Sequence, residues 1–308
     1  MNEKKISVVI SAFNEEDKIE ACLVSVAWAD EIIFIDNTST DRTSEIAGNY
    51  TKKIFKIPNN LMLNKNKNFG FEKASGNWIL SLDADERVLP ELRKEIEDAV
   101  NHDDPEIAGY WIPRKNIIFG QWIQNSIWWP DYQLRLFRKG KGKFPEVHVH
   151  EMMKVDGETR KMHEPMQHEN YSSISQFIRK MDTIYTENEA ENLIKSGKEL
   201  HWSEAIRMPV GDFLKTFFMQ KGYKDGLHGL ALSILQAFYA ELVFLKVWEN
   251  RGFEKVNNKH FLTDVHLIFQ KLSSEFRYWY LSSLIDESKN SAQKLLLRLM
   301  RKKESGKN

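Results

Sequence analysis

The sequence predicts an α/β fold in which helices flank a mostly parallel sheet, followed by a helical C-terminal region. Short apolar runs alternate with stretches of helical periodicity through the first 85 residues. This alternation is typical of parallel strands joined by right-handed helical crossovers. From Ser172 onward the periodicity is helical. We therefore expect two domains, residues 1–170 and residues 171–308.

Composition excludes some classes of protein. The 308 residues include 44 basic and 44 acidic side chains, so the formal net charge is zero. A general nucleic-acid-binding protein would carry a strong basic excess, so nucleic acid is not an expected partner. The single cysteine, Cys22, excludes an internal disulfide and fits a reducing compartment. It lies among apolar helical positions, where we expect a buried structural thiol. The apolar run at residues 6–10 is too short for a signal peptide, so we expect a cytoplasmic protein.

The N-terminal half divides into four predicted strands and the helices between them. The strands are rich in β-branched residues and cover residues 6–10, 31–35, 53–57 and 78–82. Helical spacing or a capping residue predicts helices at residues 17–29, 41–50 and 64–74, the second capped by Asp41. A further helix is expected at residues 89–100. Beyond it the alternation stops, and we expect antiparallel strands at residues 108–113, 117–122 and 133–137 to complete an acceptor cleft.

The C-terminal half is predicted to contain helices at residues 172–192, 212–220, 227–248 and 289–307, with a turn at 221–226. Residues 227–248 are long enough to cross a bilayer. Polar side chains such as Glu241 and Lys246 make a lone membrane span costly, so we expect a helix that packs in the C-terminal lobe or lies at a membrane face. The basic amphipathic segment 289–307 fits either a solvated helix end or peripheral contact with anionic lipid.

Acidic and amide side chains follow three of the predicted strands at their carboxyl ends. Asn14 and Glu15 follow the first strand, Asp36 the second, and Asp83 and Asp85 the fourth. Ligands of parallel α/β sheets bind beyond these strand ends. Two carboxylates this close repel each other, and Mg²⁺ or Mn²⁺ relieves the repulsion while accepting phosphate oxygens. The pattern predicts a metal–diphosphate clamp; the alternative is a solvated acidic turn.

Three segments together resemble the family 2 glycosyltransferases of the GT-A fold. They are Ser-Val-Val-Ile-Ser-Ala-Phe-Asn-Glu-Glu (7–16), Ile-Asp-Asn-Thr-Ser-Thr-Asp-Arg-Thr (35–43) and Leu-Asp-Ala-Asp-Glu (82–86). Residues 131–138, 149–151 and 221–226 resemble more narrowly the bacterial lipopolysaccharide core β-1,4-glucosyltransferases. The resemblance implies an inverting transfer of a hexose, glucose, from a UDP donor. The implied acceptor is a lipid-linked or polysaccharide glycan of the cell envelope, at the inner face of the cytoplasmic membrane.

The resemblance also implies roles for the donor-binding residues. Asp36 matches the acid that holds the nucleotide base, and Asn14 and Glu15 match the loop that borders the nucleoside. Asp83 matches a contact to ribose or metal, and Asp85 matches the ligand of the Mg²⁺ or Mn²⁺ that bridges the diphosphate. Arg135 lies near the same rim and is expected to hold the diphosphate or an anionic acceptor.

The resemblance also bears on the catalytic base and on a further metal ligand. Many family 2 enzymes carry Glu-Asp at the base position, and this sequence does not. Glu151 resembles the replacement and is predicted to be the base; the alternative is an ion pair with Arg135 or Arg138. His168, or else His150, is predicted to be a further metal ligand, although a hydrogen-bonded structural histidine is the simpler reading.

Two other functions remain open from the sequence. One is a nucleotide-sugar-binding module without turnover, acting as a scaffold in envelope assembly. The intact Asp-x-Asp pair favours catalysis over that module. The other is a nucleotidyltransferase, which would be expected to carry a phosphate loop rich in glycine and lysine after the first strand; this sequence has none there.

Overall fold

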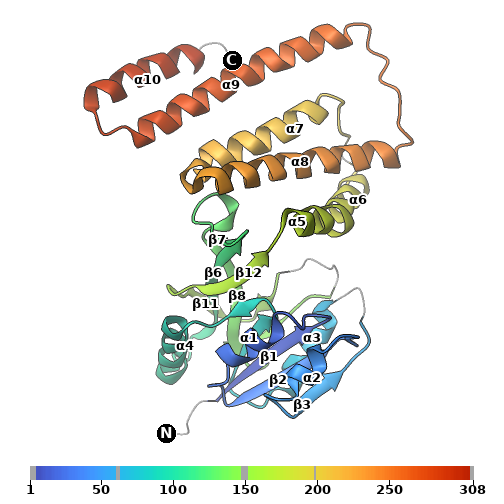
Figure 1. Ribbon diagram of the computed structural model, residues 1–308, viewed down its shortest axis with the longest axis vertical. Helices are drawn as coiled ribbons and strands as arrows, with labels where there is room; N and C mark the ends of the chain where they lie inside the picture. The colour runs from blue at the N-terminus through green and yellow to red at the C-terminus, as the bar shows by residue number, and fades with distance from the viewer. Residues whose placement is uncertain (1–4, 60–62, 147–151, 198, 306–308) are drawn as a thin grey trace. The chain divides into compact units, whose positions relative to one another are not determined.

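The structure is a computed structural model that describes residues 5–59, 63–146, 152–197 and 199–305 (Figure 1). The chain forms two compact units. The N-terminal unit comprises Met1–Ile117 and Trp129–Asn170, and the C-terminal unit comprises Ile118–Trp128 and Tyr171–Asn308.

Four parallel strands, in the spatial order β3-β2-β1-β4, form one side of the sheet in the N-terminal unit. They are β1 (Ile6–Ala12), β2 (Glu31–Asp36), β3 (Lys53–Lys56) and β4 (Trp78–Asp83), and the helices between them are α1 (Ile19–Ser25), α2 (Thr43–Ala47) and α3 (Leu63–Lys73). The strand order reverses at β1. Such a reversal is where open α/β sheets bind ligands. The predicted α/β class is confirmed.

The strand β1 is buried on both faces, which explains its uninterrupted apolar run. Val8 packs on one face in the same core as Leu23 of α1, and Val9 packs on the other with Phe71 of α3. A Cβ atom added at Gly70 of α3 would lie 2.5 Å from Val9 Cγ1, so glycine is what lets α3 approach the sheet this closely. Cys22 is fully buried, as predicted, and burial raises the pKa of its thiol.

The other side of the sheet is mixed. Its strands and helix are β5 (Glu86–Arg87), α4 (Pro90–His102), β6 (Ile107–Ile118), β8 (Asp131–Arg138), β11 (Glu158–Lys161) and β12 (Met166–Tyr171), with β9 (Gly142–Lys143) and β10 (Lys154–Val155) paired separately. β8 lies antiparallel to both β4 and β6, as predicted. The prediction of separate strands at 108–113 and 117–122 was wrong. Residues 107–118 form one strand that contains Pro113. A proline often marks the end of a strand, but here Pro113 lies within the strand, opposite Tyr132 of β8.

Two N-terminal helices differ from their predicted limits. The helix predicted at 41–50 begins only at Thr43, and Arg42 rather than Asp41 occupies the capping position. Asp41 still accepts a hydrogen bond from the Thr43 backbone N–H at 3.0 Å, so its carboxylate shapes the turn before the helix. The helix predicted at 17–29 is shortened to α1, and turn residues follow it.

The C-terminal unit is mainly helical (Figure 1). Its elements are β7 (Gln121–Trp122), η1 (Ser126–Trp128), α5 (Ile174–Lys180), η2 (Met181–Thr186), α6 (Glu187–Lys195), α7 (Glu204–Phe213), η3 (Leu214–Met219), η4 (Gly222–Asp225), α8 (Gly226–Asn250), α9 (Phe261–Glu287) and α10 (Ser291–Ser305). The prediction that a helix starts after Pro209 was wrong, since α7 runs through that proline while packing along α8. The sequence analysis did not predict α9, whose apolar residues are spread around the helix rather than along one stripe.

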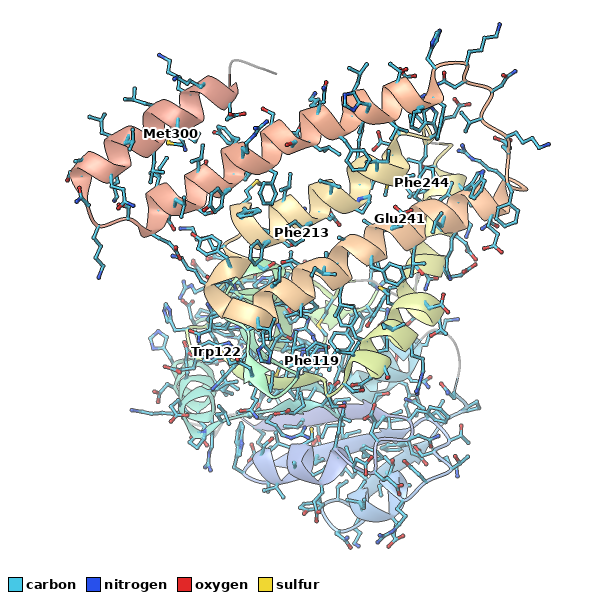
Figure 2. The ribbon with its side chains drawn as sticks, turned by 45° about the horizontal axis from the view of Figure 1, so that its top comes forward. Phe119, Trp122, Phe213, Glu241, Phe244 and Met300 are labelled. Atoms are coloured by element: carbon cyan, nitrogen blue, oxygen red, sulfur yellow. The ribbon has the colours of Figure 1, made fainter. Side chains whose placement is uncertain are left out.

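The long helix α8 belongs to the one described segment, Gly222–Asn250, that could cross a membrane by length and composition. Its polar side chains have partners on neighbouring helices: Lys246 Nζ lies 2.8 Å from Glu187 Oε2, and Gln236 donates to Asp212 at 3.3 Å. Glu241, labelled in Figure 2, is an exception, because its Oε2 atom is buried without a partner and burial raises its pKa. α8 packs against α6 and α7, in agreement with the expectation of a packed helix.

The segment 221–226 forms the turn between η3 and α8, as predicted. Lys221 has a φ of 63°, and a Cβ atom at Gly222 would lie 2.7 Å from the Thr216 carbonyl oxygen. Asp225 accepts a hydrogen bond from the Gln124 backbone at 3.1 Å, and Lys221 pairs with Asp286 at 3.1 Å. These contacts give the segment a structural role within the C-terminal unit.

Candidate active site

Two of the predicted acidic residues flank the end of β1 at one edge of the sheet. In the parallel pairing, Asp36 of β2 lies opposite Ala12 of β1, and Asp83 of β4 lies opposite Ser11. Because parallel strands end at the same edge, both aspartates lie where ligands of such sheets bind. Asp85 follows two residues after the end of β4.

Hydrogen bonds between the loops after β1 and β2 shape this edge. Asn14 adopts a φ of 53°, which asparagine tolerates better than most residues, and its side-chain oxygen accepts from the Thr40 N–H at 2.8 Å. The backbone N–H of Glu15 donates to Thr43 Oγ1 at 2.8 Å. Asn14 and Glu15 therefore hold the β1 loop against the β2 loop, beside Asp36.

Asp36 has one satisfied and one unsatisfied carboxylate oxygen. Oδ1 accepts from the Ser39 backbone N–H at 2.8 Å, whereas Oδ2 is buried without a hydrogen-bond partner. A buried carboxylate oxygen without a donor is costly and is rare in folded proteins. This atom is therefore a ready acceptor for an N–H group.

Asp83 is held between two cations. Lys67 Nζ lies 2.5 Å from Oδ1, and Arg135 Nη2 lies 2.6 Å from Oδ2. Burial by itself raises the pKa of the Asp83 carboxyl, but the charges of Arg135 and Lys67 outweigh it and hold the pKa well below its usual range. Asp83 therefore stays ionised.

Glu86 is the buried anchor of this network, and the sequence analysis gave it no role. Its Oε1 atom lies 2.5 Å from Arg135 Nη2, and its Oε2 atom accepts from the Asp83 backbone N–H at 2.9 Å. Burial raises the pKa of Glu86 despite the opposing charge of Arg135. Arg135, shared between two carboxylates, has its pKa raised because their charges outweigh the effect of burial. Glu86 thus holds Arg135 in place, and Arg135 in turn holds Asp83.

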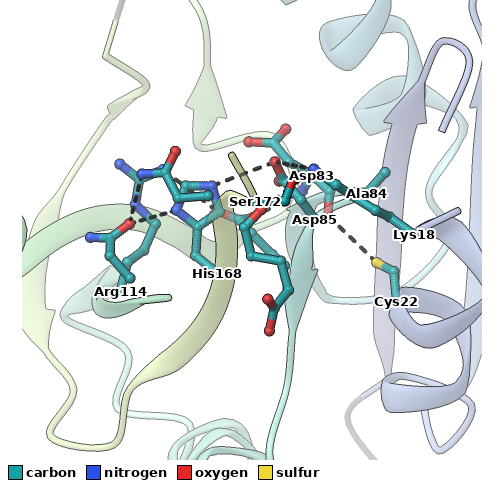
Figure 3. Close-up of polar contacts among 12 residues, drawn as sticks. Lys18, Cys22, Asp83, Ala84, Asp85, Arg114, His168 and Ser172 are labelled. Atoms are coloured by element: carbon teal, nitrogen blue, oxygen red, sulfur yellow. Dashed lines mark hydrogen bonds and ion pairs between the residues drawn. The ribbon is translucent and has the colours of Figure 1, made fainter. Parts of the chain in front are cut away.

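Asp85 faces His168 and Lys18 (Figure 3). Asp85 Oδ2 lies 3.6 Å from His168 Nε2 and 3.7 Å from Lys18 Nζ. Burial raises the pKa of Asp85, but the hydrogen bond and charge of His168 outweigh it, so the pKa is lowered overall. The structure thus brings together the two residues that the sequence analysis named as metal ligands.

Asn116 orients His168 from the other side of the ring. Its Oδ1 atom lies 2.7 Å from His168 Nδ1, and its Nδ2 atom donates to Asp131 at 3.3 Å. An amide oxygen can only accept, so Nδ1 of His168 carries a proton and donates to it. A second ring nitrogen fixed in this way is the usual arrangement of a metal-binding histidine, whose other nitrogen, here Nε2, would hold the cation.

A cavity of about 300 Å³ adjoins Asp83. Lys67, Arg114 and Arg135 contribute positive charge to its lining, and Trp111 contributes an aromatic ring. Met152 also lines it. The cavity therefore combines groups suited to an anion with a flat surface suited to a sugar ring.

The donor set fits a divalent cation that takes two protein ligands. No group of three or more His, Cys, Asp and Glu side chains that could hold a metal occurs among the residues the structure describes. Asp85 and His168 supply an oxygen and a nitrogen, while both Asp83 oxygens are already paired. Mg²⁺ commonly uses one or two carboxylates and takes its other ligands from substrate phosphates and water. Asp85 and His168 are therefore a better fit for the metal than Asp83.

Glu151, the predicted base, and His150 lie outside the described residues. No sequence motif marked Lys18, Lys67 or Asn116 as site residues; Lys18 caps α1, Lys67 lies in α3 and Asn116 lies in β6. Only Glu86 carried a signal, because it stands three positions after Asp83.

Comparison with known proteins gives consistent matches. Residues 7–156 match the sequence profile of glycosyl transferase family 2. An uncharacterized glycosyltransferase of Rickettsia typhi is 30% identical over 259 residues, which cover 80% of this chain and 87% of that protein. The lipopolysaccharide core biosynthesis glycosyltransferase LpsC of Rhizobium meliloti is 26% identical over 255 residues, covering 80% and 93%. The crystal structure of S. aureus TarS 1–349 in complex with UDP aligns with 79% of this chain and 91% of that chain, at 15% identity and a TM-score of 0.42.

Proposed function

The chain belongs to glycosyl transferase family 2, and from that premise we propose that it moves glucose from UDP-glucose to a saccharide of the bacterial cell envelope, with inversion. The acceptor proposed is the lipopolysaccharide core, in keeping with the name of the Rhizobium relative. The observation that carries the proposal is the edge at which Asp36 and Asp83 flank β1, with a basic cavity beside Asp83.

The donor nucleoside is proposed to bind at the loops after β1 and β2. Asp36 Oδ2, which has no partner in the protein, would accept the uracil ring N–H. The loop of Asn14 and Glu15 is pinned to the β2 loop and would border the nucleoside. This arrangement explains why a costly buried oxygen is kept at Asp36.

The donor diphosphate is proposed to bind between Asp85 and the cations of the cavity. A bound Mg²⁺ or Mn²⁺, held by Asp85 and His168, would stabilise negative charge on the departing diphosphate. Lys67 and Arg135 lie against Asp83 and offer N–H groups that can also serve phosphate oxygens. Asn116 keeps the His168 ring in the tautomer that this role requires.

Glu151 is proposed to remove the proton of the attacking acceptor hydroxyl. It directly precedes Met152, which lines the cavity beside Asp83. The alternative was an ion pair with Arg135 or Arg138. Arg135 already pairs with Asp83 and Glu86, and Arg138 pairs with Asp103 at 2.7 Å, which supports the catalytic role.

Release of UDP from UDP-glucose in the presence of Mn²⁺ and membrane extract tests the proposal. Asp85→Asn should lower kcat about 100-fold or more, since one charge-stabilising contact in an active site is worth that much. Asp98→Asn, an exposed aspartate on α4, is the matched control and should keep the wild-type rate. An Asp85→Asn enzyme as fast as the wild type would contradict the metal role of Asp85.

Two further outcomes separate the alternatives. Glu151→Gln should lower transfer by about 100-fold or more while leaving donor affinity unchanged in calorimetry; loss of donor binding would remove Glu151 from the base role. Donor binding by the wild-type chain, with no acceptor in the extract ever labelled, would favour the non-catalytic scaffold.

A cytoplasmic location at the inner membrane face is part of the proposal, because the acceptor is lipid-linked.

A further inference from the structure

We propose that α10 is a docking surface for an anionic lipid bilayer, with its leucines in the acyl boundary and its basic side chains at the headgroups. The proposal concerns the C-terminal unit alone. It depends on the proposed function only for its purpose, since a lipid-linked acceptor lies in such a membrane.

One side of α10 packs against α9. Leu297 is buried, Glu304 Oε2 accepts from Ser274 of α9 at 3.2 Å, and Arg301 donates to Ser282 of α9 at 3.2 Å. Positions 297, 301 and 304 are separated by four and three residues, so they lie on one face of the helix. This face determines how α10 is turned.

The opposite side of α10 is exposed and mostly apolar, and Lys303 stands on it four residues after Leu299. Leu295, Leu296 and Leu299 are 60%, 59% and 56% exposed, and Met300, labelled in Figure 2, is 47% exposed. A helix that served only to cover α9 would turn its leucines inward. Here a single leucine of α10 among the described residues, Leu297, is buried. The exposed apolar face is therefore suited to insertion into an apolar phase.

Positive charge is concentrated on the same helix. Its basic residues are Lys294, Arg298, Arg301, Lys302 and Lys303, whereas its one acidic residue, Glu304, lies 3.5 Å from Arg277 of α9. The chain as a whole has no net charge, so this concentration is local. A helix with leucines on one face and lysines and arginines beside them is the type that lies in the interface of an anionic membrane.

The charge also decides between the two possible occupants of this face. A second copy of the chain, joined through the same face by a two-fold axis, would bring two rows of like charge together. Anionic headgroups would neutralise the row while the acyl region took up the leucines. The chemistry therefore favours lipid over self-association.

Vesicle flotation with the full-length chain tests the proposal. The probes are vesicles of phosphatidylcholine alone and vesicles that also contain phosphatidylglycerol. We expect the wild-type chain to float with the anionic vesicles and to be released by high salt. Combined substitution R298Q/K302Q/K303Q should weaken binding about 100-fold, since each basic residue near the surface contributes about fivefold. Combined substitution L295Q/L296Q/L299Q should also abolish flotation.

Matched controls show whether the effect belongs to α10. K52Q/K94Q/K139Q removes three exposed lysines of the N-terminal unit, and I174Q/I178Q removes two exposed apolar residues of α5. Both should float like the wild type. Donor binding should be unchanged in every variant, so a failure of docking is distinguishable from a failure of the proposed function.

Three results would overturn the proposal. The first is a wild-type chain that stays in the supernatant with both kinds of vesicle. The second is flotation that the α10 variants retain. The third is light scattering that shows a dimer which L295Q/L296Q/L299Q converts to a monomer, because a second copy would then cover the face. Circular dichroism melts of the variants should match the wild type, since all the substituted residues are exposed.

Discussion

At the carboxyl edge of the sheet, charged side chains are buried, whereas on α10 leucines face solvent. Glu86 is fully buried and Arg135 is 5% exposed, while Leu295 and Leu296 are about 60% exposed. The two regions depart from the usual distribution in opposite directions. The amphipathic helix α4 shows the ordinary case, since it buries Leu92, Ile96 and Val100.

Buried charges and exposed leucines have different energetic costs for the folded state. Buried charges at the sheet edge are paired, so their cost appears only when one partner is removed. Exposed leucines on α10 cost the folded state little by themselves, because they are exposed in the unfolded chain as well. Substitutions of the buried charges at the sheet edge should therefore lower the stability of the fold. Substitutions of the exposed leucines of α10 should affect only membrane binding.

Arg135→Leu should give the largest loss of stability. It leaves Glu86 and Asp83 without their shared cation, and breaking a buried ion pair costs about 3–5 kcal/mol. Urea unfolding measures the change. Arg93→Leu, which removes an exposed pair with Glu97 on α4, should cost about 0.5 kcal/mol or less. Equal losses of stability in the two variants would show that the buried network contributes no more than a surface ion pair.

Leu92→Ala on α4 should lower the free energy of unfolding by about 2–5 kcal/mol, because Leu92 is fully buried in the main core. Leu296→Ala on α10 should change it by about 0.5 kcal/mol or less, since the residue is exposed. Thermal melts of the two variants compare the helices directly. A large loss for Leu296→Ala would mean that another surface covers it in solution.

Glu31 should make stability depend on pH at the amino end of the sheet. Burial raises the pKa of its carboxyl, but hydrogen bonds from Lys53, Ser7 and Ser75 outweigh it and lower the pKa from 4.5 to about 2. A lowered pKa means that the stabilisation is complete above about pH 4.5 and is lost as the pH falls toward 2. Glu31→Gln should cost about 1.5–3 kcal/mol at pH 7.

Denaturant unfolding of both proteins from pH 7 to pH 2 checks this. The difference between wild type and Glu31→Gln should shrink below about pH 4.5. A difference that stays constant across this range would show that the charge of Glu31 does not contribute.

Asn116→Leu should weaken binding of the proposed metal. Loss of the acceptor for His168 Nδ1 frees the ring tautomer, and loss of such a partner typically costs about 10–100-fold in metal affinity. Titration of UDP release with Mn²⁺ measures the shift. Asn170→Leu, whose side chain donates to the same Asn116 oxygen at 3.2 Å, should shift it less.

Much of the fold and part of the candidate site follow from local patterns. The first four strands were predicted within two residues, mainly because β1, β2 and β4 are buried on both faces and give continuous apolar runs. The strand-end aspartates were found because parallel strands end at one edge. The limits of α7 were not predicted, because packing against other helices overrides the local cost of Pro209. The helix α9 was not predicted, because its apolar residues do not form a single stripe along the sequence.

By itself the sequence determined which residues are apolar, which strands are parallel and which acids end them, because these depend on neighbours along the chain. Tertiary structure alone decided which partners those acids have and which face of α10 is covered. Lys67 and Arg135 reach Asp83 from positions 16 and 52 residues away, and α9 takes up Leu297 while leaving three leucines outside. Pairings across such separations are set by packing in space, which no local pattern encodes.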